Sequence, residues 1–380
     1  MSLDTENVIK KFEAVCADPY GTARAAAAGG AKVAGHMCTY TPEELLHAAG
    51  YLPVRILGWS DTTQRADGLL QAYACSLARA ALELALSGQL DFLNLMVFSH
   101  TCDTIQNLTD IWQRNVSGMN HLVLATPVNV RGEDSIAFYK RELERARGCL
   151  ETFGSRFDDA VIEDSMRLYA RHREAMRRLY ALRQANPERL SVRQMLSVVL
   201  SSFLVRKEDH LAWLGDLIAT IEKMPDAPAT KRPRILVVGS VCQTGDYLGT
   251  IEDAGCFVAD DDLCTGSRAF ATVADAGTNP LDALARRYLA RKPCPAKHAP
   301  GHDIGASLRT AVQQAQADGV VFLFTKFCDP WAFDYPYIHD TLEEAGVPSL
   351  LVEIEQHVPA SEQYKTRVEA FAEMLGAVKG

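Results

Sequence analysis

The chain has 380 residues, of which 48% are apolar and 23% are charged, as in ordinary soluble globular proteins. Its formal net charge of −9, without clusters of Lys and Arg, argues against a nucleic-acid binder. No stretch approaches the roughly 20 consecutive apolar residues of a membrane span, and the amino terminus lacks a secretory pattern. We therefore expect a cytoplasmic protein, without a membrane segment, of two or three domains.

The first part of the chain predicts alternating strands and helices. After an amphipathic helix over 1–15, apolar runs at 53–57, 92–98 and 122–125 are predicted to be strands, and 71–86 has helical spacing. Short buried strands that alternate with helices indicate a parallel, doubly wound sheet. Residues 135–225 are rich in Arg, Glu and Leu and poor in Gly, and they predict a helical layer broken at Asn186-Pro187.

A second α/β lobe is predicted after Pro225, Pro228 and Pro233. Its strands are expected at 235–238, 257–259, 320–324 and 349–353, and helices are expected to stop at Gly255, Gly319 and Gly346. We predict an α/β protein with two doubly wound parallel-sheet lobes that are related by an internal repeat. The N-terminal lobe spans 1–134, the helical insert 135–229 and the C-terminal lobe 230–380.

Cysteines recur at matching places in the two predicted lobes. His100-Thr101-Cys102-Asp103 and Lys326-Phe327-Cys328-Asp329 each follow a strand; Cys75 with Arg79 mirrors Cys264 with Arg268, and Cys38 mirrors Cys242. Ligands bind at the carboxyl ends of parallel strands, and a helix that starts after each cysteine is expected to lower the thiol pKa and favour the metal-binding thiolate. The alternative is that each Asp caps a helix and each Cys is a small filler.

The ten cysteines do not suggest a disulfide framework in a reducing compartment, and Cys16, Cys149 and Cys256 are expected to be packing residues. No Cys-x-x-Cys occurs, so a metal site must be assembled from distant segments. The chain also lacks a phosphate loop, a dinucleotide fingerprint and a Gly-x-Ser-x-Gly elbow. If ATP is involved, a partner must hydrolyse it.

Six segments together resemble the 2-hydroxyacyl-CoA dehydratase and benzoyl-CoA reductase family. They are HMCTYTPEELL at 36–46, AAGYLPV at 48–54, ACSLAR at 74–79, TCDTIQNL at 101–108, DDLCTGSR at 261–268 and KFCDP at 326–330. The length and residues 102–112 look most like the smaller, C-type subunit of ATP-dependent benzoyl-CoA reductase. Residues 326–336 look equally like the dehydratases.

The resemblance implies an iron-sulfur subunit with a [4Fe-4S] cluster on three cysteines. By position these are Cys75, Cys102 and Cys328, so both lobes would supply ligands. A related branch carries a double-cubane [8Fe-9S] cluster, for which Cys264, Cys38 and Cys294 are the additional candidate ligands. That branch is the alternative: an electron-transfer or reductase protein without an acyl-CoA substrate.

The resemblance also implies a reaction and partners. An acyl-CoA thioester would be reduced by one electron to a ketyl radical, leading either to reduction of the benzoyl-CoA ring or to dehydration of an (R)-2-hydroxyacyl-CoA to an enoyl-CoA. The enzyme would therefore be an oxidoreductase or a lyase of anaerobic metabolism. Its partners would be a related cluster-bearing subunit, in a heterodimer or a homodimer, and a separate ATP-hydrolysing iron-sulfur activator.

No catalytic residue is assigned from the sequence. His100 and Lys326 are general-acid candidates with an alternative structural role, and Arg79 and Arg268 either bind CoA phosphates or hold acidic loops such as 260–262. An aromatic group either lines an acyl pocket or belongs to the core, and consists of Trp112, Trp331, Phe333 and Tyr335. Two other classes stay open: an electron-transfer protein without a substrate pocket, and a two-lobed binding protein without redox chemistry.

Overall fold

The computed structural model describes residues 3–225, 231–272, 279–355 and 358–376. Their strands form two four-stranded sheets in which the paired strands are parallel. The first sheet, in the order β2-β1-β3-β4, contains β1 (Lys32–His36), β2 (Tyr51–Arg55), β3 (Leu95–His100) and β4 (Asn120–Ala125). The second, in the order β6-β5-β7-β8, contains β5 (Arg234–Gly239), β6 (Phe257–Asp262), β7 (Gly319–Thr325) and β8 (Ser349–Ile354).

These sheets confirm the α/β class with two parallel-sheet lobes. The strand orders of the two sheets correspond, while an internal repeat in the sequence stays a prediction. In the second lobe the central strand β7 is buried on its two faces, because its alternate residues belong to two different cores. Val321 and Leu323 pack in one of these cores, and Phe322 and Phe324 pack in the other.

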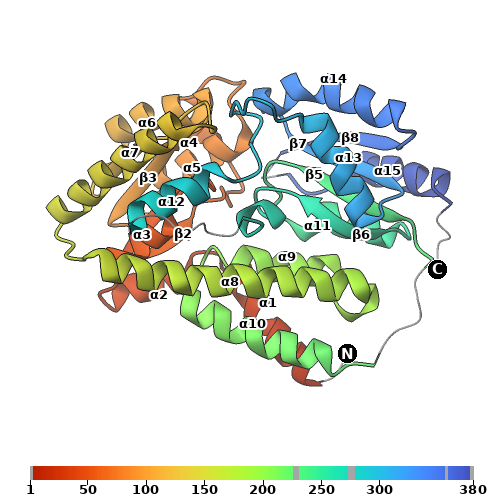
Figure 1. Ribbon diagram of the computed structural model, residues 1–380, viewed down its shortest axis with the longest axis horizontal. Coiled ribbons are helices and arrows are strands. Elements are labelled where there is room, and N and C mark those ends of the chain that lie inside the picture. The colour runs from red at the N-terminus through yellow and green to blue at the C-terminus, as the bar shows by residue number, and fades with distance from the viewer. Residues whose placement is uncertain (1–2, 226–230, 273–278, 356–357, 377–380) are drawn as a thin grey trace.

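The helices lie around the sheets in two groups (Figure 1). The helices of the first lobe are α2 (Gly21–Ala28), α3 (Glu43–Ala48), α4 (Gln64–Asp67), α5 (Ser76–Leu86) and α6 (Asp103–Asn115). Those of the second part of the chain are α11 (Gly245–Asp253), α12 (Pro280–Leu289), α13 (Ile304–Ala315), α14 (Asp329–Glu344) and α15 (Glu362–Met374). Two short 3-10 turns, η1 (Pro187–Arg189) and η2 (Ser267–Ala269), complete the set.

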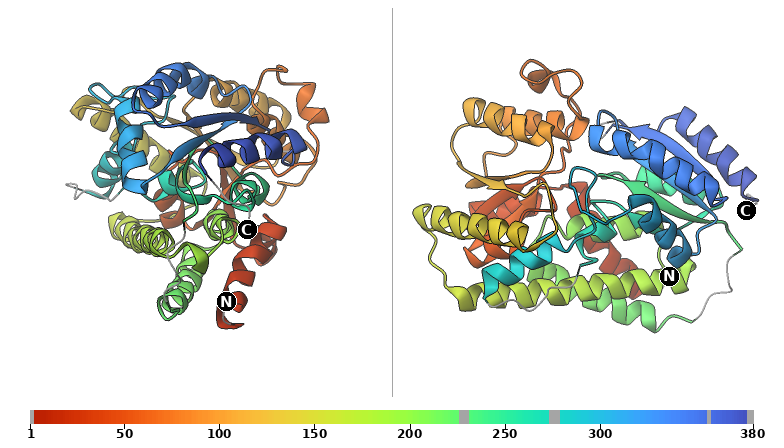
Figure 2. Two further views of the ribbon diagram at one scale, coloured as in Figure 1. Left: turned by 90° about the vertical axis from the view of Figure 1, so that its right-hand side faces the viewer. Right: turned by 45° about the horizontal axis from the view of Figure 1, so that its top comes forward.

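The predicted helical layer consists of α7 (Glu133–Thr152), α8 (Asp159–Ala185), α9 (Val192–Ser201) and α10 (Lys207–Glu222). In Figures 1 and 2, α8 runs along one side of the molecule beneath both lobes. The amino-terminal helix α1 (Leu3–Ala17) packs on α9 and α10, where Phe12 meets the rings of His210 and Trp213. The predicted break near Asn186 is confirmed, since α8 ends at Ala185.

Helix α12 belongs to the second part of the sequence but packs on the first lobe. It contacts α7 and α8, and its residues Leu284 and Tyr288 share a core with Leu95 and Val97 of β3. This pairing brings the chain that follows α12 to the junction between the lobes. The predicted boundary at 229–230 lies outside the described residues, and the three-part division of the chain stays a prediction.

Two local predictions were wrong. The helix predicted over 71–86 begins only at Ser76, since Cys75 has extended backbone angles and is the N-cap of α5. Gly319 does not stop a helix. It lies in β7, where a Cβ would press on Phe371, and the left-handed residue after α13 is Gln316. In contrast, Gly255 and Gly346 follow helix ends with positive φ, as predicted.

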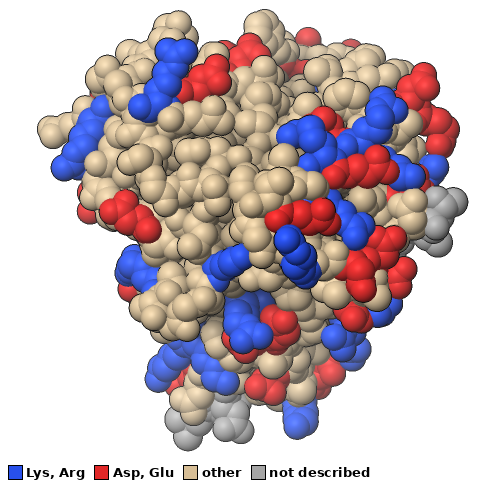
Figure 3. All heavy atoms as spheres, turned by 90° about the vertical axis from the view of Figure 1, so that its left-hand side faces the viewer, with Lys and Arg blue, Asp and Glu red and all other residues tan. Residues whose placement is uncertain are grey.

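The surface drawn in Figure 3 shows Lys and Arg side chains interspersed with Asp and Glu, beside a broad area without charged residues. Among the helices of the described residues, none is both long and apolar enough to cross a membrane.

Candidate functional site

Three of the predicted site cysteines occupy the same structural position, the N-cap of a helix. Cys102 lies between β3 and α6, Cys328 between β7 and α14, and Cys75 immediately before α5. Asp103 and Asp329 are the first residues of their helices and not the caps, so the alternative in which each Asp caps its helix is wrong. The chain thus places three cysteines at helix amino termini.

These three cysteines line one cavity between the lobes. The cavity has a volume of about 680 Å³, and its fourth cysteine is Cys294, from the loop after α12. Its remaining wall comes from the segments that follow β3, β4, α12 and β7, among them Thr101, Val128, Lys297, His302, Ile304, Phe327 and Phe333. The structure therefore brings Cys75, Cys102 and Cys328 together from both lobes, as the sequence predicts.

Burial controls the acidity of these thiols. It raises the pKa of Cys102 to about 12, an effect that the neighbouring Cys75 and Cys38 reinforce and the amide of Ile105 opposes. The pKa values of Cys75 and Cys328 are raised for the same first reason. The prediction that the helix amino termini lower the thiol pKa was wrong for the protein without a bound ion, because removing a thiolate from water costs more than the helix amides return.

The additional candidates Cys38, Cys264 and Cys294 form a second group beside the first. Burial raises the pKa of Cys294 to about 12, and the charges of Cys264 and Cys38 add to this rise. Cys264 is fixed by its backbone, whose amide donates to the carbonyl of Ser240 and whose carbonyl accepts a hydrogen bond of 2.7 Å from Arg55. Cys294 is the member of this group that lines the cavity.

Lys297 is a cavity residue that sequence reasoning missed. Its ammonium group is buried, donates to the carbonyls of His100 at 3.3 Å and Thr126 at 3.1 Å, and lies over the ring of Tyr40. Burial lowers the pKa of Lys297, and the charges of Cys38, Cys294 and Cys102 oppose that effect. It is therefore a fixed cation among the thiols. Its nearness in sequence to Cys294 was the only available signal.

The two general-acid candidates lie apart from the cavity lining. Lys326 is half exposed and pairs with Glu355 at 3.4 Å. His100 is partly buried, which lowers its pKa, and its backbone carbonyl is what meets Lys297. Neither side chain lines the cysteine cavity among the described residues.

The mirrored arginines hold acidic residues. Arg268 is buried in an ion pair with Asp262, and this confirms the acidic-loop alternative for that residue. Arg79 pairs with Asp67 at 3.2 Å and with Glu355 at 3.6 Å. Both guanidinium groups therefore already have carboxylate partners.

The aromatic group divides between core and cavity. Trp112 and Trp331 are buried, and Tyr335 packs edge-on against Phe322. Phe333 is 84% exposed and lines the mouth of the cavity. The core interpretation is thus correct for three of the four residues. The packing cysteines Cys16, Cys149 and Cys256 are also found against the apolar cores.

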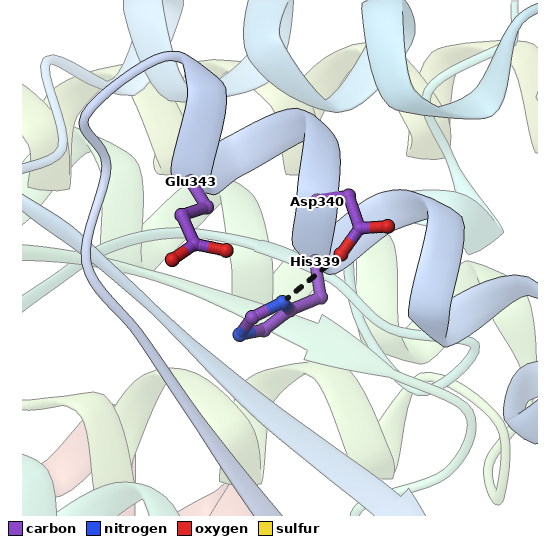
Figure 4. A group of neighbouring side chains, drawn as sticks. All are labelled: His339, Asp340 and Glu343. Atoms are coloured by element: carbon purple, nitrogen blue, oxygen red, sulfur yellow. Dashed lines mark ion pairs between the residues drawn. The ribbon is translucent and has the colours of Figure 1, made fainter.

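The spacing of the sulfurs distinguishes between kinds of metal site. Within the described residues, the one group of three ligand atoms that lie within 4.8 Å of one another is His339, Asp340 and Glu343, on the exposed side of α14 (Figure 4). No three of the described cysteine sulfurs lie as close together as that. Tetrahedral zinc with Zn–S bonds of about 2.3 Å holds its sulfurs roughly 3.8 Å apart, so the cavity does not suit a single zinc ion.

The fold and the cavity define a two-lobed α/β protein whose sheets enclose a thiol-lined site at the carboxyl ends of their strands. A sequence model of the family described as 2-hydroxyglutaryl-CoA dehydratase, D-component, matches residues 38–375, and the chain belongs to this family. The resemblance inferred from the six segments is confirmed.

Named relatives cover most of the chain. It is 32% identical to lactoyl-CoA dehydratase subunit beta of Anaerotignum propionicum over 90% of this chain and 91% of the relative. It is 28% identical to the (R)-phenyllactyl-CoA dehydratase beta subunit of Clostridium sporogenes over 91% and 92%, respectively. It is 27% identical to a benzoyl-CoA reductase subunit of Thauera aromatica over 90% and 91%. The prediction of an enzyme subunit, of a dehydratase or a reductase, is confirmed at this level.

Proposed function

We propose that the chain is the iron-sulfur subunit of an acyl-CoA enzyme, with a [4Fe-4S] cluster held by Cys75, Cys102 and Cys328. The observation that carries this proposal is the meeting of three N-cap cysteines from two lobes at one cavity of about 680 Å³. Three ligands leave one iron of a cubane without a protein thiolate. The open side of the cavity is where a substrate or another ligand would approach that iron.

The residues present fit such a cluster. Thiolates are the ligands that iron-sulfur clusters prefer, and the wide spacing of the sulfurs suits a polynuclear centre better than a single ion. Burial keeps these thiols protonated in the free protein, so a metal that displaces the protons gains binding energy that water cannot supply. The amides at the three helix amino termini are then positioned to stabilise the negative charge of the thiolates.

When bound, the cluster would supply a strongly reducing electron for a thioester carbonyl. The residues of this chain would contribute a water-poor wall and a fixed cation. Lys297 is held by two backbone carbonyls beside the thiols, and the ring of Phe333 narrows the mouth of the cavity. We propose, as partners, a related cluster-bearing subunit and a separate ATP-hydrolysing iron-sulfur activator, all in the cytoplasm, and the names of the relatives as subunits support the first of these.

The test begins with protein purified without oxygen. We expect about four irons and four acid-labile sulfides per chain, with absorbance near roughly 400 nm that bleaches on reduction. The chain is then combined with its partner subunit and activator, and assayed with (R)-lactoyl-CoA, (R)-phenyllactyl-CoA and benzoyl-CoA, since the named relatives include subunits of all three enzymes. Colourless, iron-free protein would overturn the cluster. Iron-loaded protein that converts none of the three thioesters would overturn their assignment as substrates.

A double-cubane cluster is the second candidate, and a specific observation favours it. Cys294 lines the same cavity as the three proposed ligands, and the charges of Cys264 and Cys38 act on it. Six cysteines are thus gathered at one junction. About eight irons per cluster, with loss of iron in Cys264→Ala, would support this candidate over the single cubane.

Lys297 provides a prediction on the redox potential of the cluster. Replacing it with Met removes a buried positive charge beside the thiols, so the more negative, reduced form of the cluster loses stabilisation. We expect the midpoint potential to fall by roughly 60 mV, a tenfold change in a one-electron equilibrium, and Lys297→Arg to retain most of it. An anaerobic redox titration followed by EPR measures both. A shift in Lys326→Met without one in Lys297→Met would instead return the role to Lys326.

A further inference from the structure

A second, smaller cavity lies apart from the cysteine cavity and is lined by buried charges. It has a volume of about 40 Å³. Its wall comes from the loop and helix after β1, from β2, α8, α10 and α12, and from the residues next to η2. Its charged side chains are Glu43, Glu44, Arg55, Arg173, Lys207, Arg287 and Arg291. The proposed cluster site uses none of them as ligands.

Positive charge exceeds negative charge around this cavity. Five cations face two carboxylates, and all five cations are buried. Glu43 pairs with Lys207 at 3.1 Å, and Glu44 is shared between Arg173 at 2.7 Å and Arg287 at 3.1 Å. The two carboxylates thus leave an excess of three positive charges. Buried charges are normally paired, because removing an ion from water costs several kcal/mol.

The excess has two parts. Arg55 and Arg291 donate to backbone carbonyls, and Arg55 also feels the charges of Cys264 and Cys38, so thiolates can balance that side. Arg173 and Arg287 lie on the other side of the network. The charges that act on these two come mainly from Glu44, Tyr288 and each other, and no thiol is among the main ones.

Arg173 and Arg287 also have nitrogen atoms that the described residues leave without a hydrogen-bond partner. These atoms are Nη2 of Arg173 and Nε of Arg287, although the two residues are only 4% and 3% exposed. Burial lowers the pKa of Arg173, which is the expected response of an incompletely balanced cation. A hydrogen-bond acceptor that carries negative charge would satisfy both the charge and the geometry.

We propose that this cavity binds one small inorganic oxyanion of sulfate or phosphate size between Arg173 and Arg287. A volume of about 40 Å³ has room for a single group or about three waters, since one water needs roughly 10–15 Å³ of such space. Arginine forks recognise oxyanions through paired N–H donors. The anion would balance the buried charge that Glu44 alone leaves, independently of the cluster.

Equilibrium dialysis of the full-length, cluster-bearing chain with radiolabelled sulfate, at constant ionic strength set with chloride, tests this proposal. We expect one saturable site per chain. Arg173→Gln should weaken binding roughly tenfold or more, as expected for a lost hydrogen bond to a charged group. Ala269→Met, which fills the cavity and keeps every charge, should abolish binding. The control Arg167→Gln removes an exposed arginine on α8 and should bind as wild type does.

Three outcomes would overturn the proposal. Absence of saturable binding would mean that the cavity holds water, and sulfate binding that persists in Ala269→Met would place the anion elsewhere. Methyl phosphate that binds as well as inorganic phosphate would mean that the cavity takes the end of a larger ligand and not a free ion. The cluster content of each variant is measured in parallel, so a failure of the cluster proposal is seen separately.

Discussion

Replacing Cys328 with Ala is expected to reduce the iron content from about four per chain to near zero and to remove the EPR signal of the reduced cluster. Cys328 is one of three thiols on the cavity wall and the only one that the second lobe contributes to the proposed cubane. Two remaining thiolates from the first lobe would hold the cluster by one side alone. Cys102→Ala and Cys75→Ala should give the same loss.

The controls are cysteines of matched chemistry outside the cavity. Cys256 is buried in an apolar core, and Cys16 packs against the same core, where it donates to the carbonyl of Ser197. Cys256→Ala and Cys16→Ala should retain all of the iron. Retention of iron in Cys328→Ala would contradict the ligand assignment. Loss of iron in both Cys328→Ala and Cys264→Ala would identify the larger, six-cysteine site.

The location of Cys102 and Cys328 could be predicted from the sequence because it depends on local order. A cysteine directly after a buried parallel strand must lie at the carboxyl edge of the sheet, and the strands β3 and β7 were recognisable from their apolar runs. The pKa of each thiol depends on more than local order. It follows from how deeply the neighbouring loops bury the sulfur, which a helix start in the sequence does not disclose.

The contribution of the loop at 293–302 could not be predicted. This segment has no strand or helix pattern, and it lines the cavity because α12 packs on α7 in the other lobe. That pairing depends on apolar contacts between residues far apart in the chain, such as Leu284 and Leu143. Cys294 was a candidate ligand by residue type alone, and Lys297 was missed.

Replacing Glu44 with Gln is expected to lower the free energy of unfolding by about 3–5 kcal/mol, the usual cost of removing one partner from a buried ion pair. Glu44 is 1% exposed and joins three segments. It accepts hydrogen bonds from Arg173 at 2.7 Å and from the hydroxyl of Tyr288 at 2.7 Å, and it pairs with Arg287 at 3.1 Å. A neutral amide would leave two buried guanidinium groups without any carboxylate.

The loss should be measured by chemical denaturation of wild type and variant at pH 7. Glu163→Gln on α8, where the carboxylate is half exposed and 3.7 Å from Arg167, is the control and should change stability by less than about 1 kcal/mol. The double variant Glu44→Gln with Arg173→Gln should recover part of the loss, because it removes one of the unbalanced charges. A loss below about 1 kcal/mol in Glu44→Gln would contradict the role of the carboxylate.

The pH dependence of this loss follows from the pKa of Glu44. Burial alone raises that pKa, but Arg287 and Arg173 outweigh burial and bring it down to about 2. A carboxyl whose folded pKa is depressed stabilises the fold fully above its unfolded pKa of roughly 4.3, and this stabilisation disappears only as the pH falls toward the folded value. The difference between wild type and Glu44→Gln should therefore stay constant from pH 7 to about pH 5. A difference that shrinks within this range would mean that Glu44 takes up a proton near its ordinary pKa, and that the arginines do not balance it.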